Sequence, residues 1–516
     1  MKPFNRVKKI NGIDYLYRIT PYYDPVTKTT KQHSQYLGKL IDGEAVKVRK
    51  PLVRTSFDYG VLLPSWKVVE EMEMLDMLNQ LFSRDRAKAV LALAINRAVE
   101  PVAFSNAKIW YERTILSPLW GELPLSSQTL SDLMKAIGES GVAESFTELL
   151  LKKVGMSGPL LYDITSFSST SQLMDMLEYG YSRGEDSLPQ FNLSIFAHKE
   201  LGIPLGFQTY PGSIADVSTI KNTLARLQAL GLEAPTMVMD RGFYSQSNLH
   251  EMIEAGYDFI LPVPANREEC RSLMTKYHSS IERPDNLVKF EDETLFVQAV
   301  EVDVGGKTVQ GYVYFDLVRE QEEKTNFYRW LEETRQKLAE AQPWNEGHAR
   351  KLFHEKAGGL AAYFEFSYKD GKIAAEVKPK AVSARLNRCG MMVLLHSGQH
   401  SWQECLMWSR ERDIIEKMFR TLKTDLGADT VRAHRDSTAL GGIFVNFLAL
   451  IIRTRLRSMM KASKLCRKHS LASIHLELSK LRRVELADGS FVTCEVTKKQ
   501  RMIIEGLDLD LDALCA

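Results

Sequence analysis

Residues 160–167 read LLYDITSF, an apolar strand pattern with one carboxylate, Asp163, near its centre. Residues 236–240 read TMVMD, a second apolar strand that ends in Asp240 and continues directly into Arg241. A carboxylate inside a buried strand costs free energy unless it is paired or holds a cation. Acids at the carboxyl edge of a sheet also lie where α/β proteins bind their ligands. A capped or salt-bridged strand end explains either acid alone equally well, so both interpretations stay open here.

The region around these strands predicts a mixed α/β sheet. Three apolar strands are followed by a helix, a strand, a second helix and a last strand. The five strand segments are LLYDITSF, FNLSIFAH, IPLGFQTY, TMVMD and YDFILPV. Short turns join the first three, whereas the stretches DVSTIKNTLARLQALG and QSNLHEMIEAG separate the later ones with helical periodicity.

Other segments flank this sheet. Residues 1–54 contain twelve Lys/Arg against four Asp/Glu, and strand patterns around the turn-rich DPVTKTT predict a basic β-hairpin there. Residues 65–157 have helical periodicity and predict a helical domain. Beyond the sheet, residues 287–317 are strand-rich, a charged helix follows, and YFEFSYKDGKIAAEV predicts a strand pair. After MMVLLHSG the chain is mostly helical up to residue 469.

Composition excludes several classes of protein. A chain of 516 residues is too long for one hydrophobic core, and 44% hydrophobic with 26% charged residues is ordinary for a globular protein. The net charge of +2 does not by itself indicate a nucleic-acid partner. Six scattered cysteines without a CxxC pair exclude a disulfide scaffold and fit a reducing cytoplasm. The longest apolar run, residues 441–452, is shorter than the roughly 20 residues of a membrane span.

A third acid lies in the helical stretch RERDIIEKMFRTLKTDLG, residues 410–427. At about 100° per residue, Arg412, Arg420 and Lys423 fall within about 40° of Glu416 on one helix face. One acid among three cations suits a site where the acid holds a metal and the cations hold phosphates. A solvated face with i,i+4 ion pairs is the alternative. Residues 451–469 carry seven Lys/Arg and no acid. They could form either a solvated face or a DNA-facing surface.

Taken together, the three acids resemble those of the DDE transposases of bacterial insertion sequences, in the branch with a β-rich insertion before the final acid. The signature of that branch is Tyr, two residues, Arg, three residues, Glu, six residues, Lys. Arg412, Glu416 and Lys423 match its spacing, while Ser409 stands at the tyrosine position. The resemblance also includes YDITSFSS, GYSR, GIPLGFQTYPGSIADVST, MDRGFYSQSNL and the N-terminal YLGK, and so touches nearly the whole chain.

The resemblance implies an RNase H-like catalytic core at residues 158–427, interrupted by a β-rich insertion at residues 265–390. It implies a DNA-binding role for the basic residues 1–64 and for the helical residues 65–157. The mainly helical residues 428–516 would serve dimerisation or DNA contact.

The resemblance also implies a transposase that cuts at the terminal inverted repeats of its element and joins the 3′-hydroxyl ends to target DNA. Asp163, Asp240 and Glu416 would bind two Mg²⁺ or Mn²⁺ ions. The cations expected at the DNA are Arg412, Lys423, Arg420, Arg241 and Arg183. We expect double-stranded DNA as partner, a homodimer in the DNA complex, no membrane contact, and a location in the bacterial cytoplasm at the nucleoid. A metal-dependent nuclease of the same fold and an inactive, domesticated DNA-binding relative are the alternatives.

Overall fold

The centre of the protein is a nine-stranded mixed sheet with the order β11-β12-β13-β16-β10-β9-β6-β7-β8. This computed structural model describes residues 2–514 except 11, 48–52, 157, 172, 181–187, 215, 233–234 and 428–432. The expected mixed α/β class is confirmed. The strands that carry the first two acids and their neighbours are β6 (Leu160–Ser168), β7 (Gln190–His198), β8 (Ile203–Pro211), β9 (Met237–Val238) and β10 (Phe259–Pro262).

These five strands follow the connections in the chain. β6, β7 and β8 pair antiparallel, while β9 and β10 run parallel to β6. A short turn joins β7 to β8 as predicted, but residues 169–189 lie between β6 and β7, so the prediction of a short turn there was wrong. The crossover connections that allow parallel pairing contain α8 (Ile220–Ala229) and α9 (Gln246–Glu254). Numbered along the chain, the five strands therefore lie in the order third, second, first, fourth, fifth.

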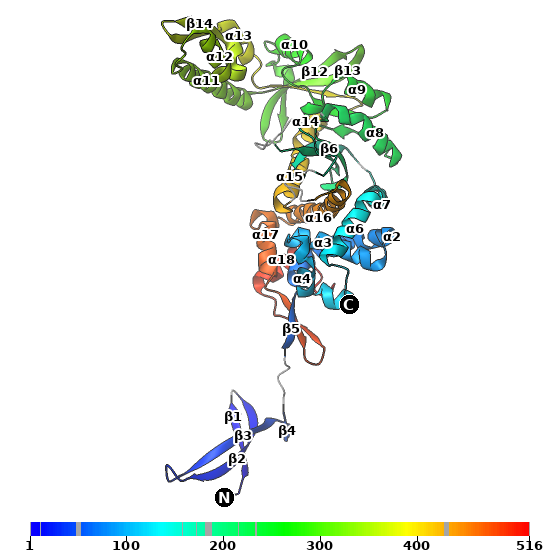
Figure 1. The fold of residues 1–516 in the computed structure, drawn as a ribbon, viewed down its shortest axis with the longest axis vertical. Coiled ribbons are helices and arrows are strands. Elements are labelled where there is room, and N and C mark those ends of the chain that lie inside the picture. Colours follow the sequence, from blue (N-terminus) through cyan, green and yellow to red (C-terminus); the bar gives the residue numbers. More distant parts are fainter. Residues whose placement is uncertain are drawn as a thin grey trace.

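A long helix, α16 (Asp436–Ala462), connects the sheet to the N-terminal helices. It packs on β8, on α3 (Arg84–Val99) and on α6 (Ser127–Glu139). Gly138 of α6 and Gly441 of α16 lie so close to the opposite backbone that a Cβ atom on either would collide with it. By length and composition α16 could cross a membrane, but 78% of its most apolar window is buried inside the protein. It is the core helix of the body in Figure 1.

The other N-terminal helices join the same hydrophobic core as the sheet. They are α1 (Leu63–Glu71), α2 (Met74–Leu81), α4 (Ala107–Arg113), α5 (Leu116–Trp120) and α7 (Val142–Val154). Residues 65–157 are helical as predicted, but their buried side chains are continuous with those of the sheet and of α16.

Residues 265–390 contain helices as well as strands. α10 (Glu268–Tyr277) precedes β11 (Leu287–Phe290), β12 (Glu293–Val304) and β13 (Lys307–Asp316), and these strands extend the central sheet through β16 (Met391–His396). A separate small core follows, at the top of Figure 1. It is formed by α11 (Leu317–Ala339), α12 (Glu346–Ala357), β14 (Phe364–Lys369), β15 (Lys372–Val377) and α13 (Pro379–Leu386). The prediction of a β-rich segment therefore describes only part of it.

The N-terminal segment is a four-stranded antiparallel sheet, where the sequence predicted a single hairpin. Its strands are β1 (Phe4–Ile10), β2 (Ile13–Asp24), β3 (Thr29–Ile41) and β4 (Glu44–Val46), and Figure 1 shows it set apart from the body. The predicted turn DPVTKTT does join β2 to β3, where Asp24 accepts hydrogen bonds from Val26 and Thr27. The additional strands arise because the chain turns again at Gly12 and Gly43, both at positive φ.

The C-terminal region is not entirely helical. Along the chain, β17 (Arg482–Leu486) and β18 (Phe491–Thr493) lie between the helices α17 (Leu471–Leu478) and α18 (Lys498–Gly506). β17 pairs with β5 (Val53–Asp58), more than 400 residues earlier in the chain, and the three strands form a separate small sheet. The C-terminal strands thus anchor the segment that leads out to the N-terminal sheet.

Candidate active site

Asp163 and Asp240 lie at the same level of two neighbouring strands. The parallel register pairs Leu161 with Val238, and each acid follows two residues later on its own chain. Asp163 lies within β6 with a side chain only 11% exposed, whereas Asp240 lies two residues beyond the short strand β9 and is 37% exposed. Asp240 accepts a hydrogen bond from the Arg241 backbone and caps a short helical turn.

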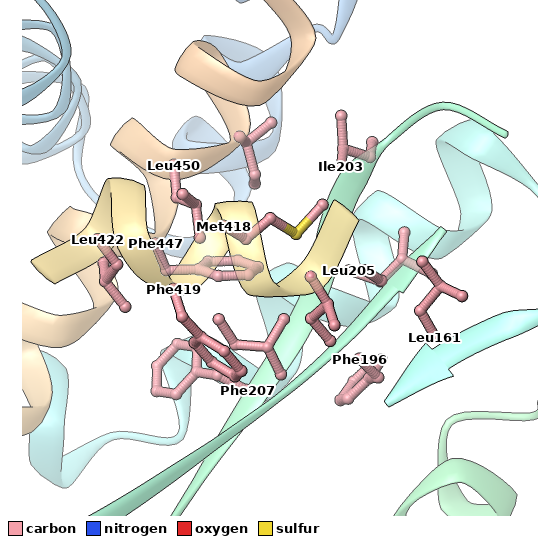
Figure 2. Packing of buried hydrophobic residues seen from close by; sticks show 14 of the residues in the cluster. Leu161, Phe196, Ile203, Leu205, Phe207, Met418, Phe419, Leu422, Phe447 and Leu450 are labelled. Carbon is pink, nitrogen blue, oxygen red and sulfur yellow. The ribbon is translucent and has the colours of Figure 1, made fainter. Parts of the chain in front are cut away.

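Glu416 comes from α15 (Asp413–Arg420), which packs against the sheet. Met418 and Phe419 of α15 and Leu422 just beyond it are buried. Figure 2 shows them between Leu205 and Phe207 on β8 and Leu450 on α16. Because this apolar face is fixed in the core, Glu416 is held on the other side of the helix, with a side chain 56% exposed.

The stretch 410–427 is not one continuous helix, contrary to the prediction. α14 (Trp402–Glu411) ends just before Arg412, α15 begins at Asp413, and Thr421–Asp425 form a π-helical segment. A π-helical turn takes one more residue than an α-helical turn, so it rotates the residues after it. The predicted alignment of Lys423 with Glu416 therefore does not hold as calculated, although the 412–416 spacing does.

Arg412 brings the three acids together. Its guanidinium donates a hydrogen bond of 2.8 Å to Oε1 of Glu416 and lies 3.5 Å from Oδ1 of Asp240 and 3.7 Å from Oδ2 of Asp163. Its side chain is 18% exposed, so these contacts are partly shielded from water. The sequence predicted the three acids as one site and Arg412 as a DNA contact. The sequence did not predict that Arg412 contacts all three acids. Its i,i+4 spacing to Glu416 indicated only the contact with Glu416.

The other predicted cations lie at different places. Lys423 lies over the ring of Phe167, 5.2 Å from its centroid, at the far end of the strand that carries Asp163. Arg420 is exposed on α15, and Arg241 is exposed beside Asp240. Arg183 lies outside the described residues. The roles of these cations at DNA stay predictions.

The donor set suits a hard divalent cation, since it consists of carboxylate oxygens from three elements that converge on one charged group. In the part of the chain that the structure describes, no three acidic, His or Cys side chains are close enough to hold one ion as they stand. The guanidinium of Arg412 lies among the three carboxylates. Asp163, Asp240 and Glu416 could therefore hold a metal after this cation has moved.

The first three arginines of the basic stretch 451–469 make contacts within the protein. Arg453 donates to the Ala98 carbonyl at 2.8 Å and lies 3.2 Å from Asp425. Arg457 pairs with Asp425 at 2.6 Å and also contacts Thr421, while Arg455 pairs with Glu71. Arg453 and Arg457 attach the π-helical segment behind Glu416 to α16, and Arg455 attaches α1 to it. The DNA-facing interpretation was therefore wrong for the buried Arg453 and stays a prediction for the other two.

The match to a family model decides the identity of the catalytic region. The model of the transposase DDE domain matches residues 158–452, which include all three acids. The chain belongs to this family. DDE transposases cleave DNA and transfer strands, and the family generally uses divalent metal ions. The prediction of a DDE transposase is thus confirmed, whereas the insertion-sequence branch and its signature stay predictions.

The comparison with solved structures adds a distant similarity. A cryo-EM structure of a piggyBac transposase synaptic complex with hairpin DNA has 9% sequence identity and a TM-score of 0.38. The similarity covers 84% of this chain and 82% of that chain. A search of curated proteins finds no match.

Proposed function

We propose that this DDE transposase cuts DNA at the terminal inverted repeats of a bacterial insertion sequence and joins the 3′-hydroxyl ends to target DNA. The observation that carries the proposal is the convergence of Asp163, Asp240 and Glu416 on one guanidinium. Three acids from separate elements, more than 70 residues apart in sequence, have no local reason to meet at one cation. A site built for a cation accounts for it.

The strand order supports an RNase H-like core. Three antiparallel strands followed by two parallel ones, in the order third, second, first, fourth, fifth, is the arrangement expected of that fold. In this arrangement the first acid lies on the first strand and the second acid follows the fourth, which are neighbours. We propose that residues 158–427 form this core and that residues 265–390 are its insertion.

The chemistry proposed for the site assigns different roles to its residues. Asp163, Asp240 and Glu416 would hold two Mg²⁺ or Mn²⁺ ions, which supply an activated attacking oxygen and stabilise the leaving oxygen. The protein's own cations would hold the DNA backbone: Arg412 can grip a phosphate through two N–H groups, and Lys423 acts as a point charge. Arg420, Arg241 and Arg183 are proposed as further phosphate contacts.

The N-terminal sheet is proposed as a second DNA contact. Its register places Arg6, Tyr17 and Tyr36 in one row across three strands, and Lys8 lies over the ring of Tyr17 at 4.8 Å. Residues 1–54 carry a local net charge of +8, from twelve basic and four acidic residues. Cations beside aromatic rings suit a surface that contacts phosphates and the edges or faces of bases.

The remaining expectations follow from this function. Joining two element ends at one target requires two active sites, so we propose a homodimer in the DNA complex. Double-stranded DNA is both substrate and target, and a cytoplasmic location at the nucleoid would follow. Residues 65–157 and 428–516 would contribute further DNA or dimer contacts.

The test is an assay with the purified protein, Mg²⁺ and DNA that carries the sequences flanking its gene. Transposition predicts cuts at the boundaries of short inverted repeats, followed by products in which the 3′ ends are joined to a second plasmid. Cuts without sequence preference and without joined products would favour the metal-dependent nuclease instead. End binding without cleavage in either Mg²⁺ or Mn²⁺ would favour the inactive DNA-binding relative.

A further inference from the structure

We infer that Arg412 is the internal counter-cation of the three acids, holding them together until a divalent ion binds and displaces its guanidinium. The inference rests on the proposed function, because it concerns the same metal site. It assigns to Arg412 a positioning role in the protein without DNA, in addition to the phosphate contact proposed above.

Arg412 contacts more acids than an arginine in an ordinary helix ion pair does. An i,i+4 ion pair on a helix has one acid as partner, and Glu416 fills that role at 2.8 Å. The same guanidinium also lies near Asp240 and Asp163, which come from two strands of the sheet. One helix residue thus connects three elements, and each of the three contacts is with an acid proposed as a metal ligand.

Charge makes such a cation necessary. Three carboxylates around one centre repel each other, and the repulsion is strongest where water is excluded. Asp163 is the most enclosed of the three, with a side chain only 11% exposed. A positive group among them lowers this repulsion and keeps the acids in place. Arg412 provides one positive charge, whereas a divalent ion provides two, so the ion can replace it.

The location of Arg412 suits a residue that changes partners. It lies between the end of α14 at Glu411 and the start of α15 at Asp413, outside the body of either helix. Glu416 is more than half exposed, so the guanidinium can move from the acids toward solvent on the side of Glu416. A released guanidinium beside the acids would be available to a phosphate of the bound DNA.

This account predicts an effect opposite to that of a metal ligand. Removing a ligand weakens metal binding, whereas removing a competing cation strengthens it. Arg412→Gln should therefore bind Mn²⁺ more tightly than the wild type, on the order of tenfold, because three carboxylates are left without their internal partner. Arg412→Lys keeps the charge and should stay near the wild type.

The experiment measures Mn²⁺ binding to the full-length protein without DNA, by electron paramagnetic resonance. The matched control is Arg410→Gln, since Arg410 lies two residues away and pairs with Glu293 at 2.6 Å instead of with the three acids. It removes the same charge at a similar place and should leave Mn²⁺ affinity unchanged. Asp240→Asn reports whether the ion binds at the acids at all and should weaken binding.

The outcomes separate the inference from the proposed function. Unchanged or weaker Mn²⁺ binding by Arg412→Gln, together with weaker binding by Asp240→Asn, would overturn the inference and leave the metal site intact. If Asp240→Asn bound Mn²⁺ as tightly as the wild type, both the inference about Arg412 and the proposed metal site would be overturned. Chemical modification of Arg412 by phenylglyoxal in the wild type gives a readout that needs no variant. Mn²⁺ should speed the modification, and an unchanged or slower rate would also contradict displacement.

Discussion

Asp163 and Asp240 lie at the same level of adjacent parallel strands, each two residues beyond the pair Leu161 and Val238. Neither acid needs the other for this placement, because the apolar residues of the two strands fix the register. Their carboxylates are thus held close by buried packing, despite the repulsion between like charges. The sheet places two acids of the site, and α15 adds the third.

Replacing any of the three acids should stop DNA cleavage and spare DNA binding. Asp163→Asn, Asp240→Asn and Glu416→Gln each remove a metal-binding charge at nearly constant volume, so cleavage should fall at least about a hundredfold, or about 2.7 kcal/mol. DNA affinity comes mainly from Lys and Arg contacts with phosphate and should change little. The control is Asp413→Asn on the same helix, an exposed acid paired with Lys417. Near wild-type cleavage by one acid variant would remove that acid from the site.

Lys423 should contribute to holding the cleaved DNA end. A charge-assisted contact with phosphate is worth about 1.5–3 kcal/mol, so Lys423→Met should weaken binding of cleaved ends or slow strand transfer accordingly. Met keeps the apolar stem over Phe167. Lys417→Met, in the same helical stretch but paired with Asp413 at 2.5 Å, is the control and should behave as the wild type. Equal strand-transfer rates for the two variants would place Lys423 outside the DNA interface.

The N-terminal sheet should carry part of the salt dependence of end binding. For every phosphate that the protein no longer neutralises, the slope of log K against log salt becomes shallower by about 0.9. Deleting residues 1–54 should therefore flatten this slope, and the double change Arg6→Gln with Lys8→Gln should account for part of the effect. Lys31→Gln is the control, because Lys31 already pairs with Asp24 at 2.5 Å. A deletion that leaves the slope unchanged would exclude the sheet from the interface.

Asp425 should be important for stability. It pairs with Arg453 and Arg457, and the Arg453 side chain is 10% exposed, so Asp425→Ala leaves a nearly buried charge without its acid. Because Asp425 itself is 30% exposed, the decrease in the free energy of unfolding should be moderate, about 2–3 kcal/mol in urea. Asp413→Ala breaks an exposed pair and should cost about 0–1 kcal/mol. Equal decreases in the two variants would show that the arginines do not anchor the segment behind Glu416.

His475 should make stability fall in mild acid. Burial, together with the nearby charge of Arg453, lowers its pKa from 6.5 to about 4. Between pH 6.5 and 4 the unfolded chain binds a proton that the folded protein does not, so this contribution to stability is present above pH 6.5 and is lost as the pH falls. The slope should be at most about 1.4 kcal/mol per pH unit. His475→Gln should flatten it in urea unfolding at pH 5–7, and an identical slope would exclude this histidine as the cause.

Local sequence patterns predicted the parts of the fold that are locally determined. Apolar runs of strand length marked β6 to β10, and the short turn between β7 and β8 implied their antiparallel pairing. The short turn predicted between β6 and β7 was wrong, because residues 169–189 separate these strands. Asp163 and Asp240 could be identified because a carboxylate is conspicuous in an apolar strand. Glu416 was identified by its spacing to Arg412. The two side chains do meet in the structure, because four residues span about one helical turn.

The remaining features depend on partners distant in the sequence. The alignment of Lys423 assumed a continuous α-helix, and the π-helical segment from Thr421 changes the rotation. A run of arginines carries no information about its partners, so the pairing of Arg453 with Asp425 was not predictable. The contact of Arg412 with all three acids depends both on the register of the sheet and on how α15 packs against it. These features involve residues far apart in the sequence, so no local pattern predicts them together.

The most direct test of the central claim is to locate Mn²⁺ in crystals of the protein by its anomalous scattering. The claim is that Asp163, Asp240 and Glu416 form one divalent-metal site. The account predicts Mn²⁺ ligated by carboxylate oxygens of these acids, with the Arg412 guanidinium displaced from among them. Mn²⁺ at saturating concentration that binds elsewhere, with Arg412 still in contact with all three acids, would contradict it.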